Sequence, residues 1–333
     1  MKTTSISVMN LCVPCENRCR YCLLSYDGRV EGADYRRSES YAKRFFDWLQ
    51  ENRRDVDFNF GFGYSMEHPK LLEAIDFCRS IGSAGGRFLQ FDGMQFRTEA
   101  QLRQLLGDLQ NHGIQLIDLT FYGTRDYHDR FAARKGDFQL MADTLAAANQ
   151  VGLDVTVSIP LTDENADQID DLILELERYQ VERIVCFVPH SEGRGRLLDP
   201  VRLSGKGLAH LGSKARQCFN DTRFRTERNW LARGEFPAPQ KRALAVTLTP
   251  DNIGFFEQLG FAETIAYLEE LDDTYYAAIP DMAKLAECFG DPGNDRYYSL
   301  RDLYLHYQRR YIVENHLQIY DVNDERHCFS RRF

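Results

Sequence analysis

The sequence lacks several features that mark special classes of protein. Its 333 residues contain no run of about 18 or more apolar residues, the length that a membrane-spanning helix needs. No segment typical of a secretory signal peptide precedes the first expected strand. There is also no internal repeat of the solenoid kind and no low-complexity linker. We therefore expect a globular protein that is neither secreted nor bound to a membrane.

Charge and cysteine content narrow the classes further. The formal net charge is −9, which gives no general reason to expect a nucleic-acid partner. Nine cysteines without a secretory signal favour a reducing, cytoplasmic compartment over a disulfide framework. Hydrophobic residues make up 43% of the chain, so a core can form. The length suits one large domain or two ordinary ones.

What the sequence does contain is a dense group of cysteines near its N-terminus. Cys15, Cys19 and Cys22 are spaced C-x3-C-x2-C after a short β-like run at 5–10. Three thiolates on one tight loop can hold three corners of a cubane iron–sulfur cluster, which leaves one iron open for chemistry. Cys12 allows a second interpretation, because two C-x2-C pairs can also hold a zinc ion. Only three residues separate the pairs, which is short for a zinc site.

Residues 1 to about 203 alternate expected strands with expected helices. Strands are predicted at 5–10, 56–62, 87–91, 115–122, 153–160 and 183–189. Helices are predicted at 38–53, 69–81, 98–111, 137–151 and 166–179. Strands that alternate with helices are typical of parallel βαβ units. The sequence therefore predicts an α/β fold in this part of the chain.

The cysteine motif and the alternation together resemble the radical SAM (S-adenosylmethionine) superfamily, in which C-x3-C-x2-C follows the first barrel strand. The resemblance implies a partial (β/α)6 TIM-like barrel over residues 1–203, with sites at the carboxyl ends of the strands. It implies a [4Fe–4S] cluster on Cys15, Cys19 and Cys22, with Cys12 outside the ligand set. It also implies SAM as a second cofactor. The zinc interpretation needs no such array of strands and helices.

Further motifs at the strand ends resemble the same superfamily. Residues 62–72 read FGYSMEHPKLL and are similar to the family segment GGEPLLHP, with departures at Phe62, Tyr64 and Ser65. The strand at 115–122 leads into residues similar to the family course SLDG…HD…RG.GSF, with Tyr122 where the family often has Asp. In that course Arg134 is expected to pair with the SAM carboxylate, because a guanidinium grips a carboxylate bidentately.

The resemblance implies a set of residues around the two cofactors. The expected contacts to SAM and the cluster are Tyr21, Gly63, Tyr64, Thr120, Arg134, Ser158, Val188 and Pro189. Polar groups placed to face the pocket supply the catalytic candidates, which are His190, Glu192 and Tyr122. We expect Asn165 to cap a helix rather than to bind a ligand.

The chain changes character near Ser204, where the alternation ends. Residues 204–333 are expected to form a mostly helical α+β cap that closes the open side of the barrel and shapes the substrate pocket. A strand is predicted at 243–249 and helices at 253–271, 280–289 and 299–313. Residues 214–242 are rich in arginine and aromatic residues, which suits a solvated surface or a grip on an acidic ligand. Cys218, Cys288 and Cys328 are too dispersed to predict an auxiliary cluster.

The implied function is reductive cleavage of SAM to a 5′-deoxyadenosyl radical that abstracts hydrogen from a peptide or a small molecule. An electron donor such as flavodoxin or ferredoxin is expected as a partner, and a nucleic acid or a membrane is not. Two alternatives stay open. One is a zinc-dependent binding or regulatory module, and the other is a sensor that binds cluster and SAM without catalysis.

Overall fold

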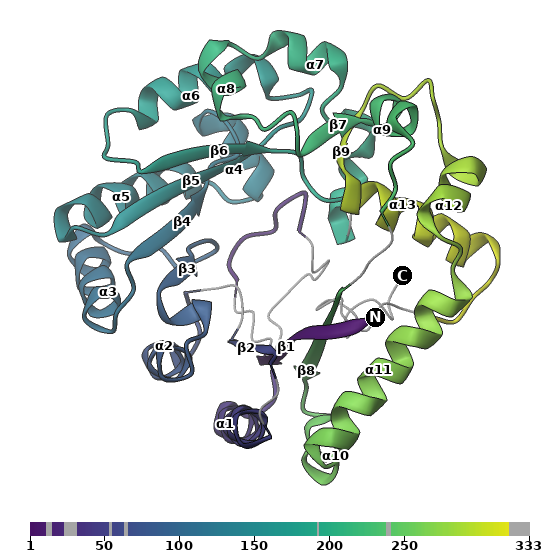
Figure 1. Ribbon diagram of the computed structural model, residues 1–333. Helices are drawn as coiled ribbons and strands as arrows, with labels where there is room; N and C mark the ends of the chain where they lie inside the picture. The colour runs from purple at the N-terminus through teal and green to yellow at the C-terminus, as the bar shows by residue number, and fades with distance from the viewer. Residues whose placement is uncertain are drawn as a thin grey trace.

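The computed structural model describes residues 1–10, 15–22, 32–52, 55–62, 66–191, 193–237 and 241–319. Parallel strands form two groups around a common interior, with helices on the outside (Figure 1). One group has the order β2-β1-β8 and the other the order β3-β4-β5-β6, and every neighbouring pair in both is parallel. The fold is a partial α/β barrel of the TIM type, which confirms the predicted fold class.

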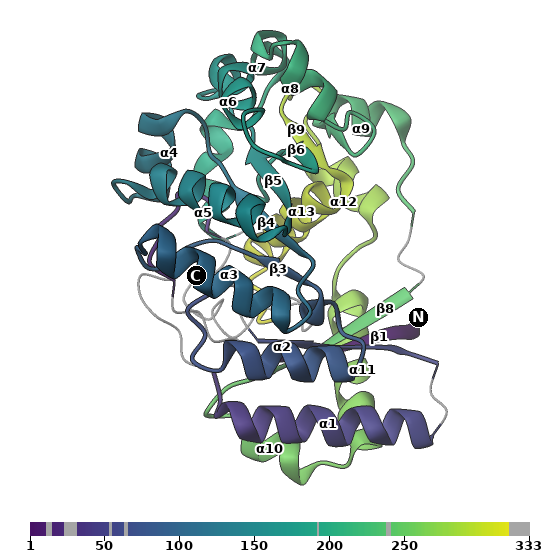
Figure 2. The same ribbon diagram turned by 90° about the vertical axis from the view of Figure 1, so that its left-hand side faces the viewer.

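The six predicted strands of the barrel are all present. They are β1 (Lys2–Asn10), β2 (Asp57–Gly61), β3 (Phe88–Gln90), β4 (Leu116–Thr120), β5 (Asp154–Pro160) and β6 (Arg183–Phe187). The helices that follow them are α1 (Tyr35–Glu51), α2 (Leu71–Ser80), α3 (Glu99–Asn111), α5 (Asp137–Val151) and α6 (Ile169–Leu176). Figure 2 shows α1, α2, α3 and α5 side by side on the outer surface.

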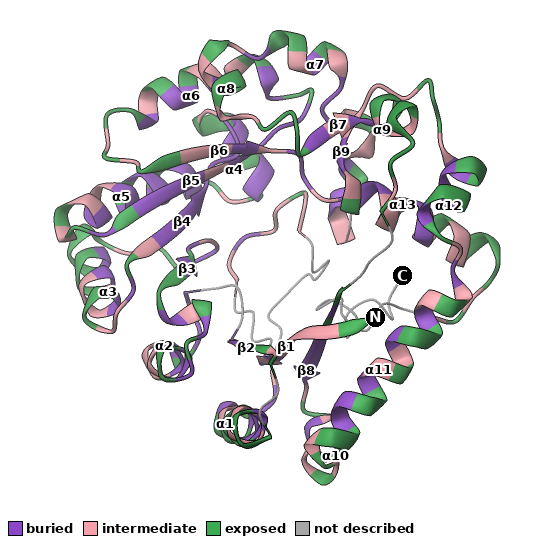
Figure 3. Ribbon diagram, viewed as in Figure 1, coloured by how far each residue is buried: buried purple, intermediate pink, exposed green. Residues whose placement is uncertain are grey.

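Local sequence explains why these elements form and which face they bury. Helix α3 begins at a capping box, in which Thr98 and Gln101 satisfy each other's backbone amides. Its buried residues Leu102, Leu106 and Leu109 recur at helical spacing, so one stripe packs on the sheet. Strand β5 is buried along most of its length, as expected for a parallel strand covered on both faces. Figure 3 shows this contrast between buried strands and helices with one exposed side.

The C-terminal part contributes a strand to the barrel. Strand β8 (Lys241–Leu248) runs parallel to β1, from the pair Lys2 and Lys241 to the pair Asn10 and Leu248. The strand predicted at 243–249 therefore lies in the same sheet as β1. This sheet therefore contains strands from both sides of the domain boundary that the sequence predicts after residue 203.

The helix predicted at 253–271 is wrong, because the structure has two helices there. They are α10 (Ile253–Gln258) and α11 (Phe261–Ala278), and the backbone is extended at Leu259 and Gly260 between them. A buried ion pair ties α11 to β8, with Arg242 Nε 2.6 Å from the Asp272 carboxylate. Breaking such a buried pair costs about 3–5 kcal/mol, so α11 is held firmly against the barrel.

A second hydrophobic core lies beyond the barrel, around α12 (Met282–Phe289) and α13 (Leu300–Glu314). Both helices were predicted. The elements that the sequence did not predict are the 3-10 helix η1 (Ala84–Gly86), α4 (Arg125–Ala132), the 3-10 helix η3 (Gly193–Val201), α7 (Gly205–His210), α8 (Ser213–Cys218), β7 (Phe224–Thr226), α9 (Glu227–Arg233) and β9 (Tyr297–Ser299). Among the described residues, no helix combines the length and apolar character needed to cross a membrane.

Candidate active site

The cysteine loop, residues 15–22, is held in place by backbone hydrogen bonds to three other segments. Its start bonds to the turn after β3, its middle to the C-terminal end of α4, and its end to η3. The bonds run from Glu16 N to Gly93 O (2.8 Å), Arg18 N to Ala132 O (2.9 Å), Arg20 N to Phe131 O (3.0 Å) and Arg194 N to Cys22 O (3.0 Å). These contacts place the loop at the carboxyl ends of the strands, as expected for a barrel enzyme.

Gly93 shows how closely the loop approaches the barrel. Its φ is +67°, and a Cβ atom added there would lie 2.1 Å from Cys15 Sγ. Both the backbone conformation and the contact therefore require glycine. The turn after β3 therefore packs directly against Cys15.

The three cysteines are partly buried and form no disulfide bond with the described residues. Burial raises the pKa of the Cys19 thiol, the hydrogen bond with Tyr122 lowers it, and the charges of Cys15 and Cys22 raise it further. The three thiols therefore lie within electrostatic reach of one another. Within the described part of the chain, no three His, Cys, Asp or Glu side chains converge on a point where a single ion would bind. Cys thiolates are the ligands of iron–sulfur clusters, so the donor chemistry of this loop fits a cluster. Cys12 lies outside the described residues.

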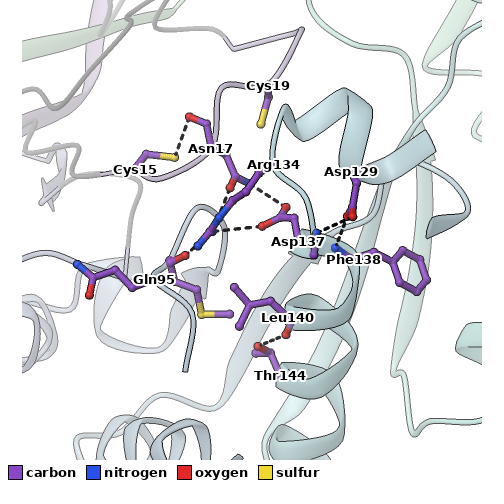
Figure 4. Close-up of polar contacts among 12 residues, drawn as sticks. Cys15, Asn17, Cys19, Gln95, Asp129, Arg134, Asp137, Phe138, Leu140 and Thr144 are labelled. Carbon is purple, nitrogen blue, oxygen red and sulfur yellow. Dashed lines mark hydrogen bonds and ion pairs between the residues drawn. The ribbon is translucent and has the colours of Figure 1, made fainter. Parts of the chain in front are cut away.

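A buried carboxylate joins the cysteine loop to the barrel (Figure 4). Asp137, the first residue of α5, is 1% exposed. Its side chain accepts hydrogen bonds from Asn17 Nδ2 (3.0 Å) and His128 Nε2 (3.1 Å), and Arg134 Nη1 lies 3.3 Å away. A buried charge needs such partners. Asp137 therefore fixes the loop through Asn17, which lies between two of the cysteines.

His128 reaches the same carboxylate in one defined tautomer. The backbone amide of Tyr122 donates to His128 Nδ1 at 3.2 Å, so this nitrogen carries no proton and Nε2 donates to Asp137. The next residue, Asp129, accepts from Gly136 N (2.6 Å) and Phe138 N (2.9 Å) and so caps the start of α5. The His-Asp pair of the family-like motif therefore positions α5 and its carboxylate.

Arg134 lies between the loop and α5 and stacks on the Phe96 ring at 4.0 Å. Its Nη1 atom donates to Met94 O (2.5 Å) and Asn17 Oδ1 (3.3 Å). The other guanidinium nitrogens make no hydrogen bond to the described residues. The Nη1 atom of Arg134 therefore stabilises the cysteine loop. The Nε and Nη2 atoms are not used in these bonds.

A sequence model of the radical SAM superfamily matches residues 9–176, about half of the chain. The chain belongs to the radical SAM superfamily. Its members use a [4Fe–4S] cluster and SAM, and the chain is accordingly an enzyme of this class. No curated protein matches its sequence.

Three solved structures of radical SAM enzymes are similar to this one. Coproporphyrinogen III oxidase (HemN) from Escherichia coli is 10% identical, with a TM-score of 0.46 and coverage of 93% of this chain and 91% of that one. HydG, a maturase of the [FeFe]-hydrogenase, is 11% identical, with a TM-score of 0.42 and coverage of 99% and 82%. SuiB from Streptococcus suis, bound to its precursor peptide SuiA, is 13% identical, with a TM-score of 0.41 and coverage of 57% and 40%. The chain thus spans about two fifths of the SuiB length. At these identities the similarity concerns the fold alone.

Two hydroxyls that the radical SAM resemblance assigned to SAM donate to carboxylates inside the barrel. Thr120 Oγ1 donates to Asp92 at 2.8 Å, and Ser158 Oγ donates to Asp118 at 3.0 Å. Burial raises the pKa of Asp92 to about 7, with hydrogen bonds from Thr120 acting in the opposite direction. Sequence reasoning missed Asp92, although its position two residues after the end of β3 marks it as a residue at a strand end.

Tyr122 lies against Cys19 of the cysteine loop. Its hydroxyl is 3.1 Å from Cys19 Sγ, and its ring stacks on Phe131 with centroids 4.7 Å apart. The ring of Tyr21 packs edge-on against Tyr122, with centroids 5.7 Å apart. Tyr122 is a predicted catalytic candidate, and the structure places its hydroxyl in hydrogen-bond contact with a cysteine of the motif. If Cys19 holds a cluster as a thiolate, which has no proton, the tyrosine hydroxyl is the donor of this bond.

Of the other predicted residues, some come directly after β6, Asn165 links two strand ends, and the rest lie outside the described part of the chain. Val188 is buried, and Pro189 O accepts from Arg202 Nη1 at 2.8 Å. His190 Nδ1 is 2.5 Å from the Asp302 carboxylate at the start of α13, a partner that sequence reasoning missed because 112 residues separate the two. Asn165 bonds the ends of β4 and β5 through Tyr122 O and Pro160 O. Gly63, Tyr64 and Glu192 lie outside the described residues.

We expect the Tyr122→Phe variant to bind its cluster at a lower reduction potential. Hydrogen bonds to cluster sulfurs help to set the potential, and a net hydrogen bond of about 0.5–1.5 kcal/mol corresponds to a drop of roughly 20–60 mV for one electron. A redox titration that is monitored by electron paramagnetic resonance measures this reduction potential. Tyr127→Phe is the matched control, because the Tyr127 hydroxyl contacts Thr162 at 3.2 Å instead of a cysteine. Equal potentials in both variants would contradict the assignment.

Proposed function

We propose that this radical SAM enzyme cleaves SAM reductively and that the resulting 5′-deoxyadenosyl radical abstracts hydrogen from a peptide or small-molecule substrate. Cys15, Cys19 and Cys22 would hold the [4Fe–4S] cluster, and flavodoxin or ferredoxin would supply electrons. The observation that carries the proposal is the loop of three cysteine thiols, held by backbone hydrogen bonds at the strand ends of a superfamily domain. The cluster, when bound and reduced, supplies the electron that breaks the C5′–S bond of SAM.

The protein's own residues then have separate tasks in this proposal. Asp137 and Asn17 hold the cysteine loop, and Tyr122 donates to the Cys19 sulfur. The free edge of Arg134 binds the SAM carboxylate. Val188 and Pro189 follow β6, where the adenine would lie, and Thr120 and Ser158 keep acceptor lone pairs for SAM hydroxyls. Gly63 and Tyr64 retain their expected role at the SAM amino group.

We further propose that the part of the chain after residue 203 covers the barrel opening and selects the substrate, apart from β8. Its separate hydrophobic core supports this division. So does the pair of His190 and Asp302, which ties the end of β6 to the start of α13. In this arrangement His190 remains a candidate catalytic residue and would face the substrate between barrel and cap.

The decisive test is formation of 5′-deoxyadenosine by the reconstituted protein with SAM and dithionite. We expect the product from the wild type and none from Cys19→Ala, which should also lose most of its iron. Cys288→Ala is the control, because Cys288 is an exposed thiol outside the loop, and it should keep both iron and activity. Full iron without any 5′-deoxyadenosine would favour a sensor, and bound zinc in place of iron would favour the binding module.

Arg134→Ala should weaken SAM binding roughly 10- to 150-fold, because a hydrogen bond to a charged group contributes about 1.5–3 kcal/mol. Isothermal titration of the cluster-loaded protein measures the affinity. Arg103→Ala, which removes an exposed arginine of α3 paired with Glu99, should bind SAM like the wild type. Unchanged affinity in Arg134→Ala, with its iron retained, would exclude this role.

A further inference from the structure

A cavity of about 570 Å³ lies beside β7, α9 and the start of α13, away from the cysteine loop. Its apolar lining includes Trp230, Phe236 and Leu300. Its charged lining consists of the cations Arg225 and Arg233 and the anion Glu235, which pairs with Arg233. The site belongs to the arginine-rich stretch 214–242, which the proposed radical chemistry does not use. The cavity therefore combines a flat aromatic surface with positive charge.

Arg225 is the unusual member of this group. Arg233 is paired with Glu235 at 2.6 Å, whereas Arg225 has no hydrogen bond or ion pair to any of the described side chains. Its Nε atom is buried without a partner, and its guanidinium lies over the Trp230 ring at 5.5 Å. Buried polar groups in native structures are almost always hydrogen-bonded, and leaving one unsatisfied is costly. The Nε donor of this guanidinium thus lacks an acceptor among the described residues.

The surroundings hold Arg225 and Trp230 in fixed positions. Arg225 is the central residue of β7 and is paired with Tyr298 of β9. Trp230 Nε1 donates to the backbone oxygen of the same Tyr298 at 2.9 Å. One strand therefore positions both the backbone of Arg225 and the indole of Trp230, which places the cation beside the aromatic surface.

We propose that this cavity binds a carboxylate that is attached to an apolar or aromatic group. The carboxylate would accept from the Arg225 guanidinium, whose planar array of donors matches two carboxylate oxygens. The apolar part would lie on Trp230 and Phe236. Such a group occurs in small aromatic or aliphatic acids and at the C-terminus of a peptide. The inference does not depend on the SAM chemistry, because it rests on residues outside the cysteine loop.

Trp230 provides a reporter for the test. The chain has two tryptophans, and Trp48→Phe leaves Trp230 as the only one. We would titrate the reconstituted Trp48→Phe protein with phenylacetate and with its neutral analogue phenylacetamide and follow the tryptophan fluorescence. We expect saturable binding of the acid, at least about tenfold tighter than that of the amide, since a hydrogen bond to a charged group is worth about 1.5 kcal/mol or more. A Phe-Phe dipeptide with a free or amidated C-terminus forms the second arm and distinguishes a peptide source from a small acid.

Two variants test which arginine causes the preference for the acid over the amide. Arg225→Gln should abolish the difference between acid and amide, whereas Arg233→Gln should keep it, because Arg233 already has Glu235 as its partner. The thermal unfolding temperature of each variant reports on its folding. The acid-to-amide comparison in the Trp48→Phe protein needs no change at Arg225, so it remains valid if Arg225→Gln is unstable. Equal affinity for acid and amide, no saturable response to any of the four compounds, or an unchanged preference in folded Arg225→Gln would overturn the proposal.

Discussion

The arrangement at the strand ends depends on one buried carboxylate. Asp137 accepts hydrogen bonds from Asn17 in the cysteine loop and from His128 in α4, and it pairs with Arg134 at the start of α5. Each partner comes from a different segment, and all meet at a residue that is almost fully buried. Removing one member of a buried, charged group costs about 3–5 kcal/mol. The loop that carries the three cysteines therefore shares its stability with the barrel.

This constraint explains how a short loop can present thiols in a fixed geometry. A loop of eight residues, 15–22, has few internal hydrogen bonds, and its shape is imposed by Gly93, by the end of α4 and by Asp137. The Tyr122 hydroxyl approaches Cys19 from the segment that follows β4. Local strain is avoided because the backbone amides of the loop find acceptors in neighbouring segments. The three cysteines are thus held by the scaffold of the barrel.

Sequence patterns predicted most of the local elements and the superfamily, but not the long-range pairs. Strands β1 to β6 follow from their apolar runs, and the cluster motif is readable because its three cysteines lie within eight residues. The pairing of β8 with β1 has no such signal, because parallel strands can come from any distance in the sequence. The same holds for His190 with Asp302 and for Arg225 above Trp230. Thr120 and Ser158 look like ligand contacts in the sequence, and their carboxylate partners become visible only when neighbouring strands are aligned.

The central claim is that the Asp137-braced loop carries a cluster with one iron open to SAM. The most direct measurement is the electron paramagnetic resonance spectrum of the reduced, reconstituted protein before and after addition of SAM, in the wild type and in Asp137→Asn. The account predicts a [4Fe–4S] signal that SAM shifts in the wild type, and a weaker or unshifted signal in Asp137→Asn. Asp126→Asn, which changes an exposed aspartate in the first turn of α4, should match the wild type. A wild-type protein with no iron–sulfur signal, or with a signal that SAM leaves unchanged, would contradict the account.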